Sequence, residues 1–108
     1  MAPDPRRLAT AALRGLAPEQ VVVIQVDDGP GCPVTDDYLD ECTRYRCAPG
    51  QGDFDLGGFL RALLATGTTA PVSVEVLSDQ NDQLPPATVA GTLAIATRSV
   101  LRAAGVSG

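Results

Sequence analysis

The segment APVSVEVLSD, residues 70 to 79, has the alternating pattern of a β-strand and decides the fold. Its three valines occupy every second position, and Ser73, Glu75 and Leu77 fall in the alternate positions. Successive side chains of a strand point to opposite faces, so the valines share one face and Glu75 lies on the other. A carboxylate in such a run needs water, a cationic partner or a metal ion. The predicted strand covers Val72 to Leu77.

A second apolar run, VVVIQV from Val21 to Val26, predicts another strand, because it is rich in β-branched residues and has no internal glycine or proline. The same alternation puts Gln25 and Asp27 on one face of it. If helices cover the all-apolar faces of both strands, Gln25, Asp27 and Glu75 share the opposite side. Two purely structural roles are the alternatives to a functional site. Glu75 can lie on a solvent-exposed face of the strand, and a buried Gln25 amide can form hydrogen bonds with backbone groups.

Helical patterns alternate with these strands. In DLGGFLRALLATG, leucines and a phenylalanine recur at helical spacing, Asp55 can cap the start and Gly67 can end the helix. Further helices are predicted from Arg6 to Leu16 and from about Pro86 to Ala104, the latter ended by Gly105. The order helix, strand, helix, strand, helix predicts parallel strands joined by crossover helices.

The stretch between the first strand and the middle helix predicts a long loop. Residues 27 to 52 contain three prolines and four glycines, with one helical turn expected around Asp37 to Thr43. Gly50 and Gly52 are expected to permit a tight turn rather than to bind phosphate, because the lysine of the phosphate-binding loop pattern is missing. Helix capping is also the favoured role for Asp53 and Asp55.

The composition limits the function classes. The 108 residues carry a net charge of −5, and the eight cationic residues are all scattered arginines, which argues against a nucleic-acid partner. The chain has no histidine, so any acid–base or metal chemistry must use carboxylates, amides or thiols. Cys32, Cys42 and Cys47 lack the spacing of a zinc knuckle and are expected to be reduced thiols. No segment approaches a membrane span, and we expect a cytoplasmic protein with no membrane partner.

Three segments, VVVIQVDDGP, RCAPGQGDFDLGGFLRALLATG and APVSVEVLSD, resemble in this order the final quarter of the sugar phosphate isomerase/epimerase family, the xylose isomerase-like TIM barrels. The pattern R-x-x-P-G-x-G-x-x-D starts at Arg46, and the likeness runs from about Asp4 to Gly105. The resemblance implies an α/β fold, a partial TIM barrel holding the last two β/α units. Residues 1–108 would then be a C-terminal fragment of such a barrel domain.

The resemblance also implies a site. Gln25 and Glu75 match metal ligands of the family, for a divalent ion such as Mn²⁺, Mg²⁺ or Co²⁺, and Glu75 would also be the catalytic base. Arg46 would contact the substrate, and Asp28 falls where the family often has an acidic residue near the metal. Many members have His near position 25. Gln there is similar to the branch that contains bacterial 3-dehydroshikimate dehydratases.

The expected function is that of a metal-dependent sugar or sugar phosphate isomerase or epimerase, acting through an enediolate on a small carbohydrate-like or hydroxy-carbonyl substrate. The alternatives are a 3-dehydroshikimate dehydratase-like lyase and a non-catalytic module that self-associates through exposed barrel edges. A complete barrel of this kind has eight strands in about 250 residues. Two strands are predicted here, so whether this chain is an enzyme by itself is left open.

Overall fold

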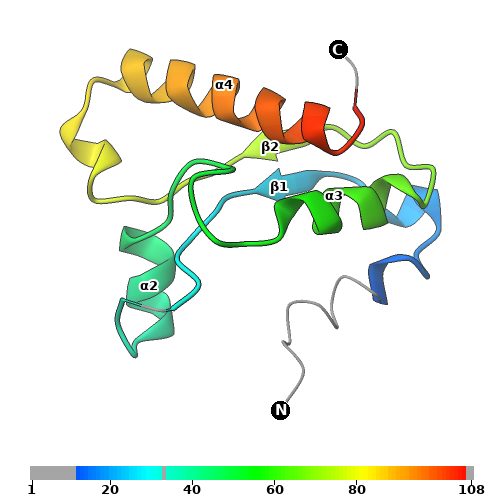
Figure 1. Cartoon of the computed structure of the whole chain (residues 1–108), viewed down its shortest axis with the longest axis horizontal. Helices are drawn as coiled ribbons and strands as arrows, with labels where there is room; N and C mark the ends of the chain where they lie inside the picture. Colours follow the sequence, from blue (N-terminus) through cyan, green and yellow to red (C-terminus); the bar gives the residue numbers. More distant parts are fainter. Residues whose placement is uncertain (1–11, 33, 107–108) are drawn as a thin grey trace.

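The computed structural model describes residues 12–32 and 34–106, whose path is shown in Figure 1. The helix predicted from Arg6 to Leu16 falls mostly outside these residues, although Leu13 at its end packs against the core. The elements of the described chain are, in order, the 3-10 helix η1 (Pro18–Gln20), β1 (Ile24–Val26), α2 (Tyr38–Arg44), α3 (Leu56–Leu64), β2 (Val72–Val74), the 3-10 helix η2 (Asn81–Gln83) and α4 (Pro86–Ala103).

The two strands form a parallel sheet, as the alternation of elements predicts. The register pairs are Ile24 with Val72, Gln25 with Ser73, and Val26 with Val74. Both strands are shorter than predicted, since the predictions ran from Val21 to Val26 and from Val72 to Leu77. β1 starts three residues later than predicted and ends at Val26 as predicted. β2 ends early because the backbone beyond it pairs with the loop instead, where Arg46 N donates to Leu77 O over 3.2 Å.

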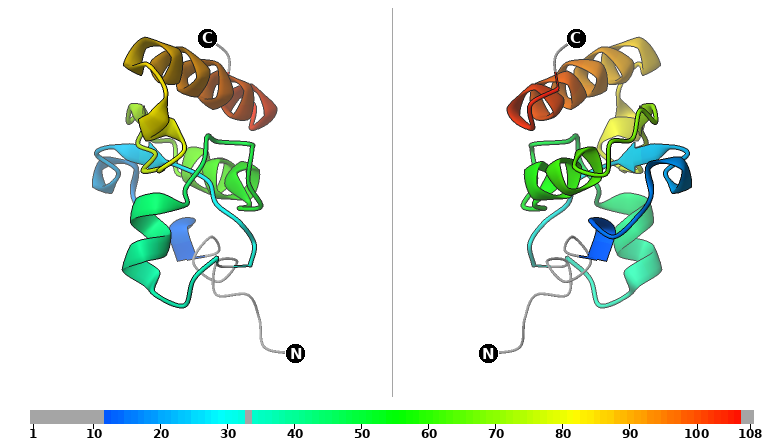
Figure 2. Two further views of the ribbon diagram at one scale, coloured as in Figure 1. Left: turned by 90° about the vertical axis from the view of Figure 1, so that its left-hand side faces the viewer. Right: turned by 90° about the vertical axis from the view of Figure 1, so that its right-hand side faces the viewer.

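The core lies between the sheet and two helices. Ile24 and Val26 are buried together with Leu60 and Leu63 of α3, and α4 packs against both α3 and β2. Figure 2 shows α4 and α2 at opposite ends of the molecule, with the strands and α3 between them. The opposite face of the sheet has no such cover in the described chain, and Gln25 and Ser73 on it are exposed.

The helix boundaries follow local chemistry. The Asp55 carboxylate accepts a hydrogen bond from Gly58 N at 3.0 Å and caps α3, as predicted. Gly67 and Gly105 have φ of +83° and +98°, which confirms them as the residues that end α3 and α4. The predicted single turn near residue 40 is a seven-residue helix, α2, because the Asp37 carboxylate caps it at two backbone N–H groups.

None of the helices in residues 12–32 and 34–106 has both the length and the apolar character needed to cross a membrane.

Candidate functional site

Gln25 and Glu75 meet on the open face of the sheet. Gln25 Nε2 donates to Glu75 Oε2 at 3.4 Å, a long hydrogen bond, and both residues are exposed. Glu75 follows β2 directly, and its N–H donates to Val26 O at 3.2 Å, which extends the parallel register by one step. Two residues 50 positions apart in the sequence are therefore brought together by strand pairing, and their side chains lie side by side.

Asp27 is a further carboxylate at this end of the sheet. It follows β1, and its Oδ2 lies 3.5 Å from Arg46 Nε in an ion pair. Burial raises the pKa of Asp27, Arg46 opposes this, and the charges of Asp28 and Glu75 raise the pKa further. Burial is thus the largest influence on the pKa of Asp27, and the charge of Glu75 is the smallest of the four.

Arg46 is anchored by the loop on several sides. Its Nη2 donates to Cys42 Sγ at 3.2 Å, and its guanidinium lies over the Phe54 ring, 4.8 Å from the centroid. Burial lowers the pKa of Arg46, but the bond to Cys42 and the charge of Asp27 outweigh this and raise it. Only 13% of its side chain is exposed. The structure thus holds Arg46 between Asp27, Cys42 and Phe54.

Asp28 organises the loop that carries Arg46. Its side chain is 1% exposed, and Oδ1 accepts from Gly29 N at 2.8 Å and Phe54 N at 3.0 Å, while Oδ2 accepts from Gly50 N at 2.9 Å. Gly50 has φ of +86°, and a Cβ at Gly52 would collide with Asp28 Oδ1 and the Gly29 backbone. Both glycines therefore serve a tight turn, as predicted, and both Asp28 oxygens are bonded to this turn.

The donors in this site fit part of a divalent metal centre. Gln25 and Glu75 offer amide and carboxylate oxygens, which suit Mg²⁺, Mn²⁺ or Co²⁺ better than metals that prefer sulfur. Within the residues that the structure describes, no three His, Cys, Asp or Glu side chains are grouped so as to hold a metal ion. The chain therefore supplies two adjacent donors, and a complete centre requires more.

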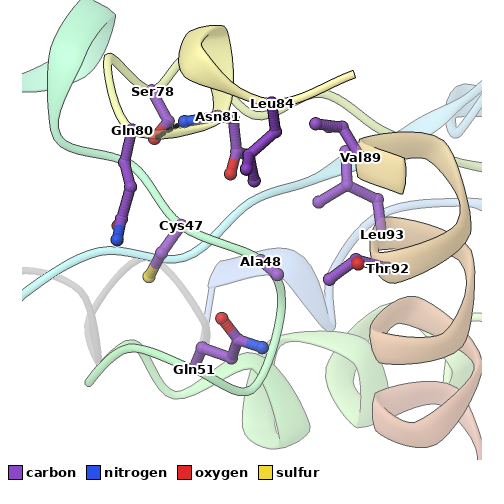
Figure 3. Close-up of a pocket in the computed structure, with 10 residues that line it drawn as sticks. All are labelled: Cys47, Ala48, Gln51, Ser78, Gln80, Asn81, Leu84, Val89, Thr92 and Leu93. Carbon is purple, nitrogen blue, oxygen red and sulfur yellow. Dashed lines mark hydrogen bonds between the residues drawn. The ribbon is translucent and has the colours of Figure 1, made fainter. Parts of the chain in front are cut away.

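A small cavity lies elsewhere, between the loop at Cys47 to Gln51, the turn at Ser78 to Leu84, and α4 (Figure 3). Its volume is about 70 Å³, and amide, hydroxyl and aliphatic groups line it. Neither Gln25 nor Glu75 is among the lining residues. This cavity is thus separate from the candidate site.

Sequence reasoning placed Asp27 on the correct face but assigned it no role, and it missed the contacts that Cys42 and Phe54 make with Arg46. The alternation along β1 was a usable signal for Asp27, since it stands two positions after Gln25. The contacts of Cys42 and Phe54 depend on how the long loop folds, which no short pattern reveals.

The described residues thus form parallel β/α units with polar groups at the carboxyl ends of the strands, which is the arrangement that builds TIM-barrel sites. Comparison with known proteins makes this more specific. No protein-family model matches the chain. It is 36% identical over 69 residues to a 3-dehydroshikimate dehydratase of Pseudomonas putida, and 40% identical over 76 residues to one of Pseudomonas aeruginosa. These matches cover 64% and 70% of this chain but 11% of each relative.

Two solved structures share the fold. A fusion protein of a xylose isomerase-like TIM barrel and 4-hydroxyphenylpyruvate dioxygenase matches 81% of this chain and 14% of its own, with a TM-score of 0.71 and 31% identity. The IolI protein with a bound zinc atom matches 85% of this chain and 32% of its own, with a TM-score of 0.75 and 25% identity. The structural neighbours of this chain are thus xylose isomerase-like TIM barrels, the fold that its sequence predicts. It spans about a tenth of the length of the curated relatives.

Proposed function

We propose that this chain forms part of a divalent-metal-dependent dehydratase of the 3-dehydroshikimate dehydratase type, which acts on a small hydroxy-carbonyl substrate. The observation that carries the proposal is the contact of 3.4 Å between Gln25 Nε2 and Glu75 Oε2 at the carboxyl end of the parallel strands. The similarity to two proteins named 3-dehydroshikimate dehydratase supports the choice of reaction. The remaining ligands would come from the rest of a complete barrel.

In this proposal Gln25 and Glu75 hold a divalent ion through their side-chain oxygens, with Mn²⁺, Mg²⁺ or Co²⁺ as the candidates. The zinc bound by the IolI neighbour supports a divalent ion in this fold. Such an ion, when bound, supplies Lewis-acid stabilisation of the negative charge that develops on the carbonyl oxygen of the substrate.

Glu75 is also the proposed base. Its carboxylate takes a proton from the carbon next to the carbonyl group, and the electron pair of the broken C–H bond forms a new C=C bond. The C–O bond to the hydroxyl group on the neighbouring carbon breaks, and that group leaves as water once it has gained a proton. The proton removal requires a Glu75 carboxylate that can reach the substrate, and its exposed position on the open face allows this.

Arg46 is the proposed substrate-binding residue. The planar guanidinium group can bind a carboxylate, a phosphate or a sugar hydroxyl with two parallel hydrogen bonds. Its anchoring by Cys42 and Phe54 would hold the group in one orientation, which favours recognition because little side-chain entropy is lost on binding. We also propose that the substrate is a small molecule rather than a nucleic acid, and that the protein is cytoplasmic.

Isomerisation or epimerisation of a sugar or sugar phosphate is the second candidate, because the structural neighbours include a xylose isomerase-like barrel. Such a reaction begins with the same removal of a proton by Glu75 and differs in where the proton returns. A non-catalytic module that associates through the open sheet is the candidate from another class, and the exposed Gln25 and Ser73 are consistent with it.

The decisive experiment compares Glu75→Gln with Glu19→Gln in the full-length protein, meaning the complete barrel of which this chain forms part in the proposal. The protein is supplied with Mn²⁺. Chromatography follows both the consumption of 3-dehydroshikimate and its products. Glu75→Gln should lower kcat at least about 100-fold, because it removes both the base and a charged ion ligand while it keeps the shape of the side chain. Glu19 is exposed on η1, away from the site, and Glu19→Gln should keep full activity.

Unchanged turnover in Glu75→Gln would contradict the assignment. Turnover of sugar phosphates but not of 3-dehydroshikimate would favour the isomerase or epimerase. A wild-type protein without activity that runs as an oligomer on size exclusion would favour the association module.

A further inference from the structure

The cavity of Figure 3 is a second place where this chain can hold a small molecule. It lies where the loop after β1 and the turn after β2 meet the first half of α4, and its volume is about 70 Å³. One water molecule needs about 10–15 Å³ of such space, so the cavity has room for about six non-hydrogen atoms. Neither Gln25 nor Glu75 lines it, so a ligand bound here does not depend on the proposed reaction.

The wall of this cavity carries polar groups that the fold does not use. Four polar side chains on the wall make no hydrogen bond within the described chain, namely Gln51, Gln80, Asn81 and Thr92. The buried Ser78 hydroxyl accepts from Asn81 N at 3.2 Å, which leaves its own proton to donate. Amides and hydroxyls both donate and accept hydrogen bonds, so these groups can bind the hydroxyl groups of a ligand.

Another part of the wall is aliphatic. It consists of Leu84, Val89 and Leu93, and Figure 3 shows these side chains on the side of α4, across from Gln51 and Gln80. Leu84 is 47% exposed, so a ligand in the cavity can remove apolar surface from water. The two kinds of wall together fit a molecule that has both C–H and hydroxyl groups.

The charges around the cavity disfavour an anion. None of the described residues on its wall has a charged side chain. Burial raises the pKa of the Cys47 thiol on this wall, and three carboxylates raise it further, against a smaller lowering by Arg46. The carboxylates are those of Asp28, Asp27 and Asp53. Many TIM barrels bind phosphate between the loops after their last two strands, but a negative potential at this wall opposes such binding here.

We propose that this cavity is a binding site for a small uncharged polyhydroxy compound of about the size of glycerol. The hydroxyl groups of the ligand bond to the amides and to Thr92, and its C–H groups contact the aliphatic wall. The affinity is expected in the millimolar range, because so small a ligand makes few contacts.

The test uses glycerol as the probe and the alkylation of Cys47 by iodoacetamide as the readout, because this thiol lines the cavity. Mass spectrometry of tryptic peptides measures the alkylation rate of each cysteine in the full-length protein at one pH. Glycerol well above its Kd should slow the alkylation of Cys47 at least about fivefold. The exposed Cys32 is the internal control for viscosity, and its rate should change little.

A pair of threonine substitutions on α4 locates the ligand. Thr92→Val removes a hydroxyl group from the wall with little change of shape, and should weaken glycerol binding about fivefold. Thr88→Val is the matched control, because Thr88 is exposed on the same helix and does not line the cavity. It should leave the affinity unchanged, and circular dichroism confirms the fold of both variants.

Three outcomes would overturn the proposal. If glycerol gives Cys47 no more protection than Cys32, the polyol does not bind in the cavity. If inorganic phosphate protects Cys47 and glycerol does not, the cavity is an anion site. If Thr92→Val and Thr88→Val both keep the wild-type affinity, the ligand lies outside the wall described above.

Discussion

At the scale of single residues, the buried Asp28 carboxylate holds the long loop together. A buried carboxylate is costly unless hydrogen bonds satisfy it, and Asp28 accepts from the backbone N–H groups of Gly29, Gly50 and Phe54. These donors come from both ends of the long loop. One side chain thus closes the loop and orients the segment between them, which includes Arg46.

Asp28→Ala should lower the free energy of unfolding by about 3 kcal/mol, because three backbone N–H groups lose an acceptor that is itself buried. Urea unfolding of the full-length protein measures this change. The control is Asp36→Ala, a substitution at an exposed aspartate of the same loop, which should change the value by less than about 0.5 kcal/mol. Equal small effects of the two substitutions would show that Asp28 does not hold the loop.

At the scale of elements, the loop between β1 and α3 limits the sheet. The strands end after three paired residues because the loop at Tyr45 to Cys47 takes over the next backbone groups on each side: Cys47 pairs with Asp28, and Tyr45 with Ser78. The loop thus covers the carboxyl ends of the strands. This is also how Arg46, which lies between the two bridges, reaches Asp27.

Gly52 in this loop and Gly91 in α4 differ in the space available for a Cβ atom, and substitution of each by alanine tests this difference. Gly52→Ala should destabilise the protein by several kcal/mol, because the new Cβ would collide with Asp28 Oδ1 and the Gly29 backbone. Gly91→Ala lies within α4, where a Cβ would meet nothing within 4 Å, and should stabilise by about 0.5–1 kcal/mol. Thermal unfolding of both variants provides the values, and a Gly52→Ala variant as stable as the wild type would contradict the close approach.

At the scale of the whole molecule, the sheet is covered on one side. Ile24 and Val26 are buried under α3 and α4, whereas Gln25, Ser73 and Glu75 are exposed on the other face. In a complete TIM barrel the face opposite the helices is the packed interior. The described residues therefore leave exposed the surface that the remaining strands of such a barrel would cover.

Two serines that are both exposed in this chain test that conclusion. In the full-length protein, Ser73→Lys should destabilise by about 3 kcal/mol or more, because a barrel interior would bury the new charge. Ser99→Lys on α4 should change stability by less than about 0.5 kcal/mol, because this helix surface faces solvent. Differential scanning calorimetry compares the two, and similar melting temperatures would mean that the sheet face stays open to water.

Local patterns in the sequence determined the elements and one face of the sheet. The alternation around Glu75, the helical spacing after Asp55 and the glycines that end the helices depend on short-range periodicity and backbone geometry, and the structure agrees with each of them. They also predicted a shared face for Gln25 and Glu75, on the condition that helices cover the apolar faces of both strands, and the observed register meets this condition.

Only the tertiary structure decided where the strands end and what surrounds Arg46. Its contacts with Asp27, Cys42 and Phe54 depend on the path of a loop whose ends are tied by Asp28. These residues have no periodic relation in the sequence. The folded loop therefore decides which of them come into contact. The physical reason is that periodicity reports which face a side chain occupies, whereas loop closure decides which side chains meet.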